Sequence, residues 1–516
     1  MKVKLNKSKK SYLIVTTLIV GMCSIMYELL ISTTSSYFLG NSIKQFSLII
    51  GFYMAFMGVG AYLAKFITKD LLFNFIKVEI WLGLIGALGV PLIYAYFLFG
   101  DYHGFNFFVL GLISIIGVLT GLEVPLITRI LEEEISLSEN ISNILAFDYL
   151  GALVATIAFP FFLLPVVGVF KSSLIFGFLN ILVGIITFIV FQNELSVTKR
   201  KRNLLFTSFL ALTILIGTCL ICSKSIIDRW NAGIFKHPVV HSQQSSYQDI
   251  TITKSDDEFR MYLNGAIQFS SKDEYRYHEA LVHVPMMQTQ NPKTVLLLGG
   301  GEGLAAREIL KYGSVEKIDL VDLDPAVTEI SSEMGLINEL NEKALEDESV
   351  HIYNQDAFVF LMESQNVYDV IIADLPDPTS ETLARLYSNA FYKLVMNNLS
   401  PDGIFCTQAT SPELTKNSFW CINETILQSG FQNSYPYRIN VPSFGNWGFI
   451  VGSQKPLNFQ FDSKIKTKFL EQNSFEHIFY FPKDTRVKGI IPNNIDQPVL
   501  MEYYLKHWRD LNHDAK

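Results

Sequence analysis

The sequence has few cysteines, few charged residues and no excess of basic ones. Of its 516 residues, 5 are cysteines and 17% are charged. These cysteines make no disulfide framework. Cys219 and Cys222 are spaced as CxxC, but they lie inside an apolar run without other metal-ligand candidates. The net charge of −8 argues against nucleic acid as a main partner and is compatible with a cationic substrate.

Long apolar stretches fill the first half of the chain. The first, residues 12–32, is too long for a signal-peptide core and has no A-x-A-like cleavage site. Further stretches lie near residues 46–68, 78–99, 106–128, 145–167, 172–192 and 204–222. Each is close to the roughly 20 residues that span a bilayer core. The pattern predicts an all-α bundle of seven transmembrane helices over residues 1–222, with the lipid bilayer as its partner.

Ionisable residues within or near these stretches are Glu28, Glu123, Arg129 and Asp148. Charges in a bilayer are costly, so they usually face the bundle interior and pair with one another. They mark either a polar pathway or cationic-amine site, or ion pairs that lock the bundle; we favour the second interpretation. Residues 223–240 resemble an interfacial linker, with Trp230 as a headgroup anchor.

The second half changes to strand-like alternation. Residues 247–253, 259–263 and 266–269 predict a small antiparallel sheet, and a helix opens at Asp273 and ends before Pro285. From residue 294 to about 452, strand-like and helix-like patterns alternate. That alternation predicts an α/β domain with a mostly parallel sheet and helices on both faces.

A glycine turn opens this α/β region. An apolar strand from Val295 ends in Gly299, Gly300 and Gly301, followed by Glu302 and Gly303. These glycines let the backbone approach a ligand closely and adopt positive φ. Asp322, about twenty residues on, suits a ribose hydroxyl pair in a nucleotide-binding fold. Without a phosphate site, this layout is typical of S-adenosylmethionine-type cofactors.

Several acids follow predicted strands or turns, where ligands of open α/β sheets bind. The five are Glu302, Asp322, Asp356, Asp374 and Asp377. We expect them to converge on one cleft, although a single acid there is often a helix cap. Such a cleft suits a cation or polyamine, or alternatively a metal. We favour the organic cation, because no histidine lies at ligand spacing with these acids.

With these motifs the chain resembles the spermidine synthase family, the polyamine aminopropyltransferases. The matching motifs are Tyr247-Gln248, Asn264-Gly-Ala-Ile-Gln268, Asp273-Glu-x-x-Tyr-His-Glu279, Gly299-Gly-Gly-Glu-Gly303, Asp322-Leu-Asp-Pro325, Asp356-Ala357, Asp374-x-x-Asp-Pro378, Phe391-Tyr392 and Trp447-Gly-Phe449. The first half resembles the membrane domain fused to some bacterial members, on the motifs Tyr27-Glu28, Gly121-Leu-Glu-Val-Pro125 and Asp148-Tyr-Leu-Gly151.

The resemblance implies transfer of an aminopropyl group from decarboxylated S-adenosylmethionine, a co-substrate, to putrescine or another diamine. It implies a Rossmann-like, methyltransferase-type fold, no permanently bound cofactor, no metal and often a homo-oligomer. Asp374 would accept the proton, and Asp377, Glu302 and His278 would contact the amines. The nucleoside would be held by Gln248, Asp322, Asp356, Ala357, Gly299 and Gly301.

The chain departs from the family pattern in the acceptor region. Leu375 and Pro376 replace two hydroxyl residues, and Glu302 stands where Asp is usual. Phe444 is nearest to the place of a substrate-contacting tyrosine. These changes leave the acceptor amine open. Alternative functions are a small-molecule methyltransferase, which the charge of Glu302 disfavours, and a polyamine transporter or sensor that uses the membrane domain.

The predicted domains are a multi-pass membrane domain (1–222), a linker (223–240), a small β-sheet (241–285), a Rossmann-like domain (286–455) and a C-terminal extension (456–516). We expect a cell-membrane protein with its soluble domain in the cytoplasm, where the cofactor is made. Basic loops, however, place the N-terminus inside, and seven spans then put the soluble domain outside.

Overall fold

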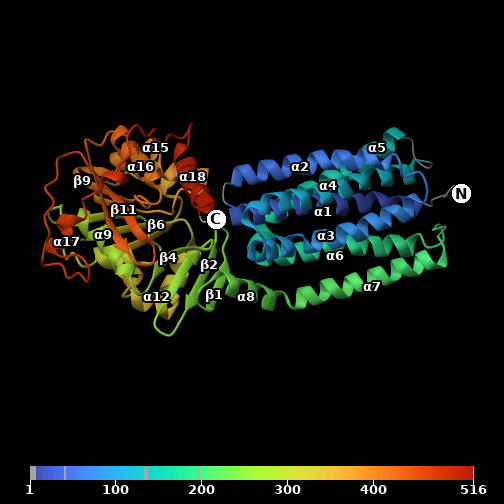
Figure 1. Cartoon of the computed structure of the whole chain (residues 1–516), viewed down its shortest axis with the longest axis horizontal. Helices are drawn as coiled ribbons and strands as arrows, with labels where there is room; N and C mark the ends of the chain where they lie inside the picture. Colours follow the sequence, from blue (N-terminus) through green and yellow to red (C-terminus); the bar gives the residue numbers. More distant parts are fainter. Residues whose placement is uncertain (1–6, 40–41, 133–136, 196, 515–516) are drawn as a thin grey trace. The chain divides into compact units, whose positions relative to one another are not determined.

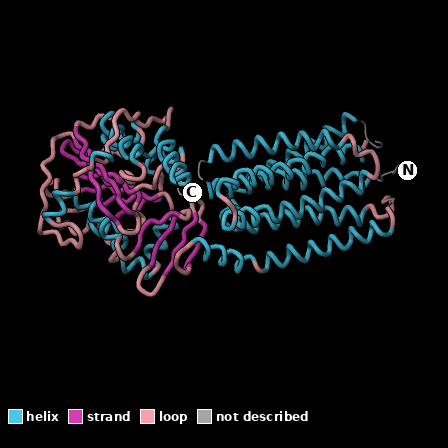
Figure 2. Tube along the Cα trace, viewed as in Figure 1, coloured by secondary structure: helices cyan, strands magenta, loops and turns pink. Residues whose placement is uncertain are grey.

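The structure, a computed structural model, describes residues 7–39, 42–132, 137–195 and 197–514 (Figure 1). Contacts divide the chain into two units, Met1–Val239 and Val240–Lys516. The first unit is helical, and the second contains all but the first residue of the strands (Figure 2). Each unit is described by itself.

The first unit contains the seven long apolar helices that the sequence predicts. Each is long and apolar enough to cross a membrane. They are α1 (Lys7–Leu39), α2 (Ser42–Ala64), α3 (Leu71–Phe99), α4 (Tyr102–Leu131), α5 (Leu137–Ala158), α6 (Val169–Val190) and α7 (Lys199–Ile221). After α5 the chain winds into a π-helix, η1 (Phe159–Val167), which contains Pro160 and Pro165. Proline has no N–H to donate, so regular α-helical bonding is interrupted there.

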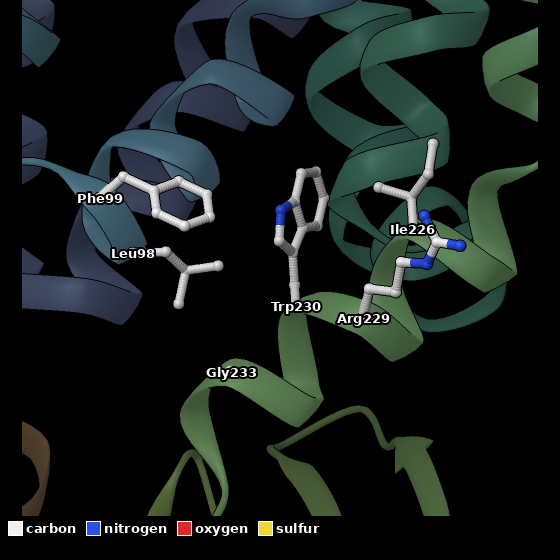
Figure 3. A pocket seen from close by; sticks show the side chains of 6 residues that line it. All are labelled: Leu98, Phe99, Ile226, Arg229, Trp230 and Gly233. Atoms are coloured by element: carbon white, nitrogen blue, oxygen red, sulfur yellow. The ribbon is translucent and has the colours of Figure 1, made fainter.

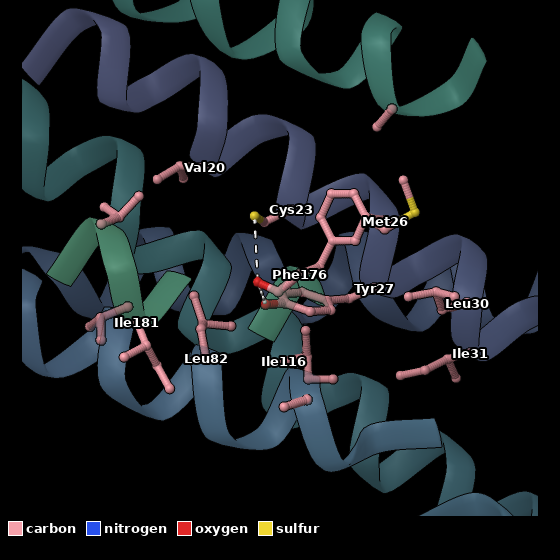
Figure 4. Close-up of a cluster of buried hydrophobic side chains, with 14 of the residues drawn as sticks. Val20, Cys23, Met26, Tyr27, Leu30, Ile31, Leu82, Ile116, Phe176 and Ile181 are labelled. Atoms are coloured by element: carbon pink, nitrogen blue, oxygen red, sulfur yellow. Dashed lines mark hydrogen bonds between the residues drawn. The ribbon is translucent and has the colours of Figure 1, made fainter. Parts of the chain in front are cut away.

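The core of this unit contains a buried polar chain among apolar side chains. Tyr27 on α1 donates to the carbonyl of Phe176 at 3.1 Å and to Oδ1 of Asn180 at 2.7 Å, and Cys23 Sγ lies 3.8 Å from the same carbonyl (Figure 4). Asn180 in turn donates to Glu79 Oε2 at 2.8 Å. The amide of Asn180 thus accepts from the tyrosine hydroxyl and donates to one oxygen of a buried carboxyl group.

Among the described residues, two acids of the long apolar helices lie beside each other, unlike the ion pairs that we favoured. Glu79, which is not among the four residues singled out above, lies beside Glu123, and both are buried. Arg129 donates to the backbone carbonyls of Ala64 at 2.9 Å and Ile67 at 2.7 Å. The arginine therefore donates hydrogen bonds to carbonyls at the end of α2, where helix carbonyls lack intrahelical donors.

The segment for which the sequence predicts a linker forms helix α8 (Ser223–Ile234). Trp230 on this helix stacks on Tyr94, with ring centroids 5.1 Å apart, and meets Phe170 edge-on. A hollow of about 410 Å³ adjoins it, lined by Leu98, Phe99, Ile226, Arg229, Trp230 and Gly233 (Figure 3). Trp230 thus packs against the helical bundle.

The second unit begins with a small antiparallel sheet, as predicted. Its strands, in spatial order, are β1 (Val239–Gln244), β2 (Asp249–Lys254), β3 (Phe259–Leu263) and β4 (Ala266–Ser270). Asn264 and Gly265 make the tight turn between β3 and β4, both with positive φ. Helix α9 (Glu274–Met286) follows, and Pro285 lies in its last turn.

A seven-stranded sheet forms the centre of this unit, in the order β10-β11-β9-β8-β5-β6-β7. Its strands are β5 (Thr294–Gly299), β6 (Lys317–Asp322), β7 (Val350–Asn354), β8 (Tyr368–Asp374), β9 (Leu399–Gln408), β10 (Asn433–Val441) and β11 (Gly445–Ser453). The five strands from β7 to β9 pair in parallel, while β10 and β11 are antiparallel. The sheet is therefore mixed, with a mostly parallel arrangement as expected.

Short helices connect these strands. They are α10 (Leu304–Ile309), α11 (Pro325–Glu333), α12 (Gly335–Leu340), η2 (Ala344–Glu346), α13 (Ala357–Glu363), α14 (Glu381–Ala384), η3 (Arg385–Tyr387), α15 (Asn389–Asn397) and α16 (Lys416–Gln428). β5 shows why both sheet faces are covered. Val295 and Leu297 belong to one buried cluster, and Leu296 and Leu298 to another. A continuous apolar run is the pattern of a strand buried on both sides.

The strand order reverses between β5 and β8. From β5 the chain continues outward through β6 and β7, and then returns to place β8 on the other side of β5. Ligands of open α/β sheets bind at such a reversal, beyond the carboxyl ends of the strands. Gly299, Asp322 and Asp374 are the last residues of β5, β6 and β8.

The C-terminal extension packs onto the rest of the second unit. It contains α17 (Gln472–His477), η4 (Lys483–Thr485) and α18 (Val499–Asp514). The carboxylate of Glu279 on α9 accepts the backbone N–H groups of Lys468 at 2.5 Å, Phe469 at 2.9 Å and Leu470 at 3.0 Å. One buried acid thus binds three successive amides of the extension.

We expect Glu279→Ala to loosen the extension, because it removes one charged acceptor from three amides. A loss of about 2 kcal/mol in docking free energy is typical for such hydrogen bonds. Because cleavage follows the open population when opening is fast, limited proteolysis within residues 456–516 should accelerate about thirtyfold. Glu316→Ala, at an exposed salt bridge with Lys293, is the control. Equal cleavage rates in both variants would contradict this role of Glu279.

Candidate active site

The glycine turn after β5 lets Asp374 lie next to the loop. Gly299 has φ 83° and is paired with Asp374 across β5 and β8. A Cβ added at Gly299 would lie 1.9 Å from the carbonyl oxygen of Asp374. Any other residue would therefore clash with β8 and strain the backbone. The glycine is what lets the two strand ends meet.

Asp322 closes the other side of the same loop. Its Oδ2 accepts the N–H of Gly301 at 3.0 Å, and its Oδ1 accepts the N–H of Asp324 at 3.0 Å. A Cβ at Gly301 would lie 2.6 Å from that Oδ2. Burial raises the pKa of Asp322 to about 6, against the lowering effect of the two N–H groups. The carboxylate predicted to bind ribose is thus fixed at the end of β6.

Gln248 lies near this edge through Asp324. Its Nε2 donates to Asp324 Oδ2 at 3.0 Å, and Ser245 donates to the same oxygen at 2.6 Å. Asp324 Oδ1 accepts the N–H of Ala326 and caps α11. The segment before β2 is thereby tied to the residues that follow β6.

Asp356 caps a helix. The sequence analysis considered this role for a single acid but did not favour it for the five acids together. Its Oδ1 accepts the N–H groups of Phe358 at 2.9 Å and Val359 at 3.3 Å, so it caps α13. Its Oδ2 pairs with Arg385. Ala357 is buried as the first residue of the helix. Both carboxylate oxygens of Asp356 thus have protein partners.

Three predicted residues come together at the centre of the site. One ligand-type atom each of His278, Glu302 and Asp374 lies within 4.8 Å of the others. His278 Nε2 is 3.4 Å from Glu302 Oε1, and its Nδ1 is 2.8 Å from Glu274 Oε2. Burial alone would lower the pKa of His278, but the two glutamates raise it to about 10. The imidazole is therefore a buried cation with a carboxylate on each side.

Asp374 is half-buried and accepts a hydrogen bond from a tyrosine. Tyr277 donates to its Oδ1 at 2.6 Å. Burial, followed by the charge of Glu302, raises the pKa of Asp374 to about 7, while His278 and Tyr277 act in the opposite direction. A carboxylate poised near neutral pH can take up a proton during a reaction.

The cluster also has the composition of a metal site, which the spacing in the sequence did not indicate. His278 on α9 approaches the acids only through the fold, although it lies 24 positions before Glu302. A metal ligand must be a neutral imidazole, however. The flanking glutamates favour the protonated form of His278 instead. The donor set therefore fits an organic cation better than a metal ion.

A buried ionic network behind His278 was missed by the sequence analysis. Arg307 donates to both oxygens of Glu274 at 3.0 Å, and its Nε donates to Glu308 at 2.9 Å. Glu308 also lies 2.8 Å from His283 Nε2. The pKa values of Glu274 and Glu308 are lowered, because hydrogen bonds from a neighbouring histidine, His278 for Glu274 and His283 for Glu308, act together with Arg307 and outweigh the burial that would raise them. Adjacent charges in the helix after the glycine loop, Arg307 and Glu308, were the available signal.

Hydrogen bonds to backbone carbonyls fix the loop from Asp374 to Asp377. The hydroxyl of Tyr387 lies 3.0 Å from the carbonyl oxygens of both Leu375 and Pro376. Gln408 Nε2 donates to the Leu375 carbonyl at 2.6 Å. Burial raises the pKa of Asp377 to about 6. The second aspartate therefore stays mostly ionised at neutral pH, ready to bind a cation.

Phe444 approaches the cluster through Tyr277. Their ring centroids lie 5.9 Å apart in an edge-on arrangement, and Phe444 also packs on Trp447. The loop between β10 and β11 thus supplies an apolar wall beside the hydroxyl that binds Asp374.

Known proteins resemble this chain over nearly its whole length. Residues 274–463 match the model of the spermine/spermidine synthase domain. The polyamine aminopropyltransferase of Leptospira interrogans is 39% identical over 500 residues, which cover 96% of this chain and 98% of that protein. That of Oceanobacillus iheyensis is 36% identical over 95% of this chain and 96% of its own.

The chain belongs to the polyamine aminopropyltransferase family. Because both matches span nearly the full length, the helical unit is common to these relatives. A crystal structure of spermidine synthase with the transition-state analogue AdoDATO is 28% identical, covers 48% of this chain and 86% of that one, and has a TM-score of 0.45. As a member of the family of these full-length relatives, the protein is a transferase of polyamine biosynthesis.

We expect Gly301→Ala to weaken cofactor binding to this aminopropyltransferase. The added methyl would displace the Asp322 carboxylate that it meets at 2.6 Å. The KM for decarboxylated S-adenosylmethionine should rise about tenfold, as for the loss of one charged hydrogen bond. Gly313→Ala, where a Cβ meets nothing within 4 Å, should leave the KM unchanged. An unchanged KM in Gly301→Ala would show that Asp322 does not depend on this approach.

The activity should also depend on the protonation of Asp374. The predicted role of Asp374 as proton acceptor requires its carboxylate form, and its pKa is about 7. A plot of log kcat/KM for the amine against pH should therefore bend near pH 7. Its slope should be greater by about one below the bend than above it. Tyr277→Phe removes a hydrogen bond that lowers this pKa and should move the bend to higher pH. A plot without any bend between pH 6 and 8 would be incompatible with this assignment.

Proposed function

We propose that the protein is a membrane-anchored spermidine synthase. It transfers the aminopropyl group of decarboxylated S-adenosylmethionine to putrescine on a Rossmann-like, methyltransferase-type sheet. The observation that carries this proposal is the position of Asp374, whose pKa is about 7, beside Glu302 and His278 at the strand-order reversal. A proton acceptor and a cation site are what this reaction requires.

The chemistry is a direct displacement. The lone pair of a neutral amine nitrogen attacks the methylene carbon next to the sulfonium, and the carbon–sulfur bond breaks. The bonding electrons stay on sulfur, which leaves as neutral methylthioadenosine. Asp374 takes up one proton from the attacking nitrogen, which is an ammonium in solution, and the new nitrogen–carbon bond then makes a secondary ammonium. Because an amine of this kind has a pKa near 10, a positioned base has to take up its proton.

Glu302 selects the decarboxylated co-substrate. Its carboxylate pairs with the free amine of the aminopropyl group and repels the carboxylate of intact S-adenosylmethionine. His278 holds Glu302 at 3.4 Å and is itself held by Glu274. This charge also disfavours a methyltransferase, which has to bind the intact molecule.

The remaining groups position the substrates. Asp377 binds the distal ammonium of the diamine, and Asp322 binds the ribose hydroxyls. Gln248 and the Asp356–Ala357 pair lie around the nucleoside. The carboxylate of Asp356 caps α13, so its contribution to adenine binding comes through the geometry of that helix start. Most of the rate enhancement then arises from orientation and electrostatics, without a metal.

The helical unit anchors the enzyme in a bilayer, with the catalytic unit on the cytoplasmic side. Large apolar side chains are exposed along its helices, among them Leu204, Phe206, Leu210, Ile214 and Ile221 on α7. In water such a surface is unfavourable, whereas lipid covers it. A cytoplasmic site gives the enzyme direct access to its charged substrates. The odd number of helices then puts the N-terminus on the other side, against the lysine pattern.

Purified enzyme with decarboxylated S-adenosylmethionine and putrescine should yield equal amounts of methylthioadenosine and spermidine. Asp374→Asn should lower kcat by about 10²- to 10⁴-fold, the usual contribution of a proton acceptor. Asp402→Asn, at an exposed salt bridge with Lys455, is the matched control and should keep full activity. No product with putrescine or any other diamine would refute the proposed function.

The orientation is tested with sealed vesicles. Protease added to inside-out vesicles should degrade residues 240–516, and protease added to right-side-out vesicles should leave them intact. The reverse pattern would place the catalytic unit outside, as the basic loops suggest.

A further inference from the structure

The C-terminal extension reaches the candidate active site at Asp377. Tyr504 on α18 is 8% exposed, and its hydroxyl donates to Asp377 Oδ2 at 2.8 Å. The matched synthase domain ends at residue 463, 41 positions earlier. A contact with a site aspartate therefore comes from a segment outside that domain.

The second oxygen of Asp377 lacks such a partner. Oδ1 is buried and has no hydrogen-bond partner of good geometry among the described residues, although the Gln408 side chain lies near enough to lower the pKa of Asp377. A buried acceptor without a donor is unfavourable, so ligand or water is expected to satisfy it. The loop itself supplies no hydroxyl, because Leu375 and Pro376 separate the two aspartates. Tyr504 thus orients one oxygen of Asp377, and the other is left to bind a donor.

A second contact joins the extension to the residues that support the Asp374–Asp377 loop. Asn493 is fully buried, and its Nδ2 donates to the carbonyls of Ala384 at 2.7 Å and Tyr387 at 3.2 Å. Its Oδ1 accepts the N–H of Leu500 near the start of α18 at 3.3 Å. Tyr387 is the residue whose hydroxyl supports the Leu375 and Pro376 carbonyls. One asparagine therefore joins the helix that carries Tyr504 to the support of the Asp374–Asp377 loop.

We propose that Tyr504 is a positioning residue for the acceptor amine. It holds Oδ2 of Asp377 so that Oδ1 faces the distal ammonium of the diamine. The C-terminal extension is then part of the acceptor site. This inference rests on the proposed function, and it assigns to a segment outside the synthase domain the recognition of an amine with two charged ends.

The test compares Tyr504→Phe with the full-length wild type in steady-state kinetics. The KM for putrescine should rise about tenfold, as for loss of a hydrogen bond to a charged group. kcat should stay within about twofold, and the KM for decarboxylated S-adenosylmethionine should not change. Tyr503→Phe, the same substitution one position earlier in the hydrophobic cluster beside α18, is the control and should behave as wild type.

Butylamine separates positioning from a general structural effect. It has the carbon chain of putrescine but no distal ammonium, so its KM should be equal in Tyr504→Phe and wild type. An unchanged KM for putrescine in Tyr504→Phe would overturn the proposal. Equal increases for putrescine and butylamine, or an equal effect of Tyr503→Phe, would do the same.

Binding distinguishes failure of this inference from failure of the proposed function. Calorimetric titration with putrescine in the presence of methylthioadenosine should show the same tenfold weakening in Tyr504→Phe. If wild type binds putrescine but forms no spermidine, the proposed function fails, and the binding ratio still decides the role of Tyr504. If binding is equal in both proteins, Tyr504 does not position Asp377.

Discussion

The site depends on one buried cation, the imidazolium of His278 held between Glu274 and Glu302. An isolated charge in this position would be costly, and pairing on both sides offsets that cost. Arg307 in turn satisfies Glu274 from the helix after the glycine loop. The charge of Glu302 close to Asp374 adds to burial in raising the pKa of Asp374. In the proposed mechanism, selection of the co-substrate and activation of the base thus share one ionic network.

Backbone geometry brings this network to the sheet. Gly299 permits β5 and β8 to end side by side, with Asp374 at the meeting point. Asp322 then closes the loop through the amide of Gly301. From the other side, Glu279 binds the extension next to His278, and Asn493 of the extension binds Ala384 beyond the Asp374–Asp377 loop. Elements separated by more than two hundred positions thus shape one site around a sulfonium nucleoside and a diamine.

The main features of the fold and part of the site follow from local sequence patterns. The carboxyl ends of parallel strands lie on one edge of a sheet, so acids that follow such strands are expected near one another. Asp322 and Asp374 do lie at the ends of β6 and β8, the two neighbours of β5. The same reasoning failed to anticipate Asp356 as a helix cap, because a cap and a ligand-binding acid have the same position in the sequence.

Tertiary contacts account for what the sequence did not reveal. His278 lies on a helix before the sheet, and its distance from Glu302 depends on packing. Tyr504 meets Asp377 only because the extension folds back. Glu79 is a single acid in an apolar helix, and its place beside Glu123 and Asn180 depends on how α3, α4 and α6 pack. The spacing of residues along the chain does not predict such contacts.

The central claim is that these side chains form one binding site for the nucleoside and the diamine together. An experimental structure of the enzyme with methylthioadenosine and putrescine tests it most directly. The account predicts one putrescine nitrogen within hydrogen-bond distance of Asp374, the other beside Oδ1 of Asp377, and the thioether sulfur facing the first nitrogen. Ligand density away from Asp374, or the two ligands in separate places, would contradict it.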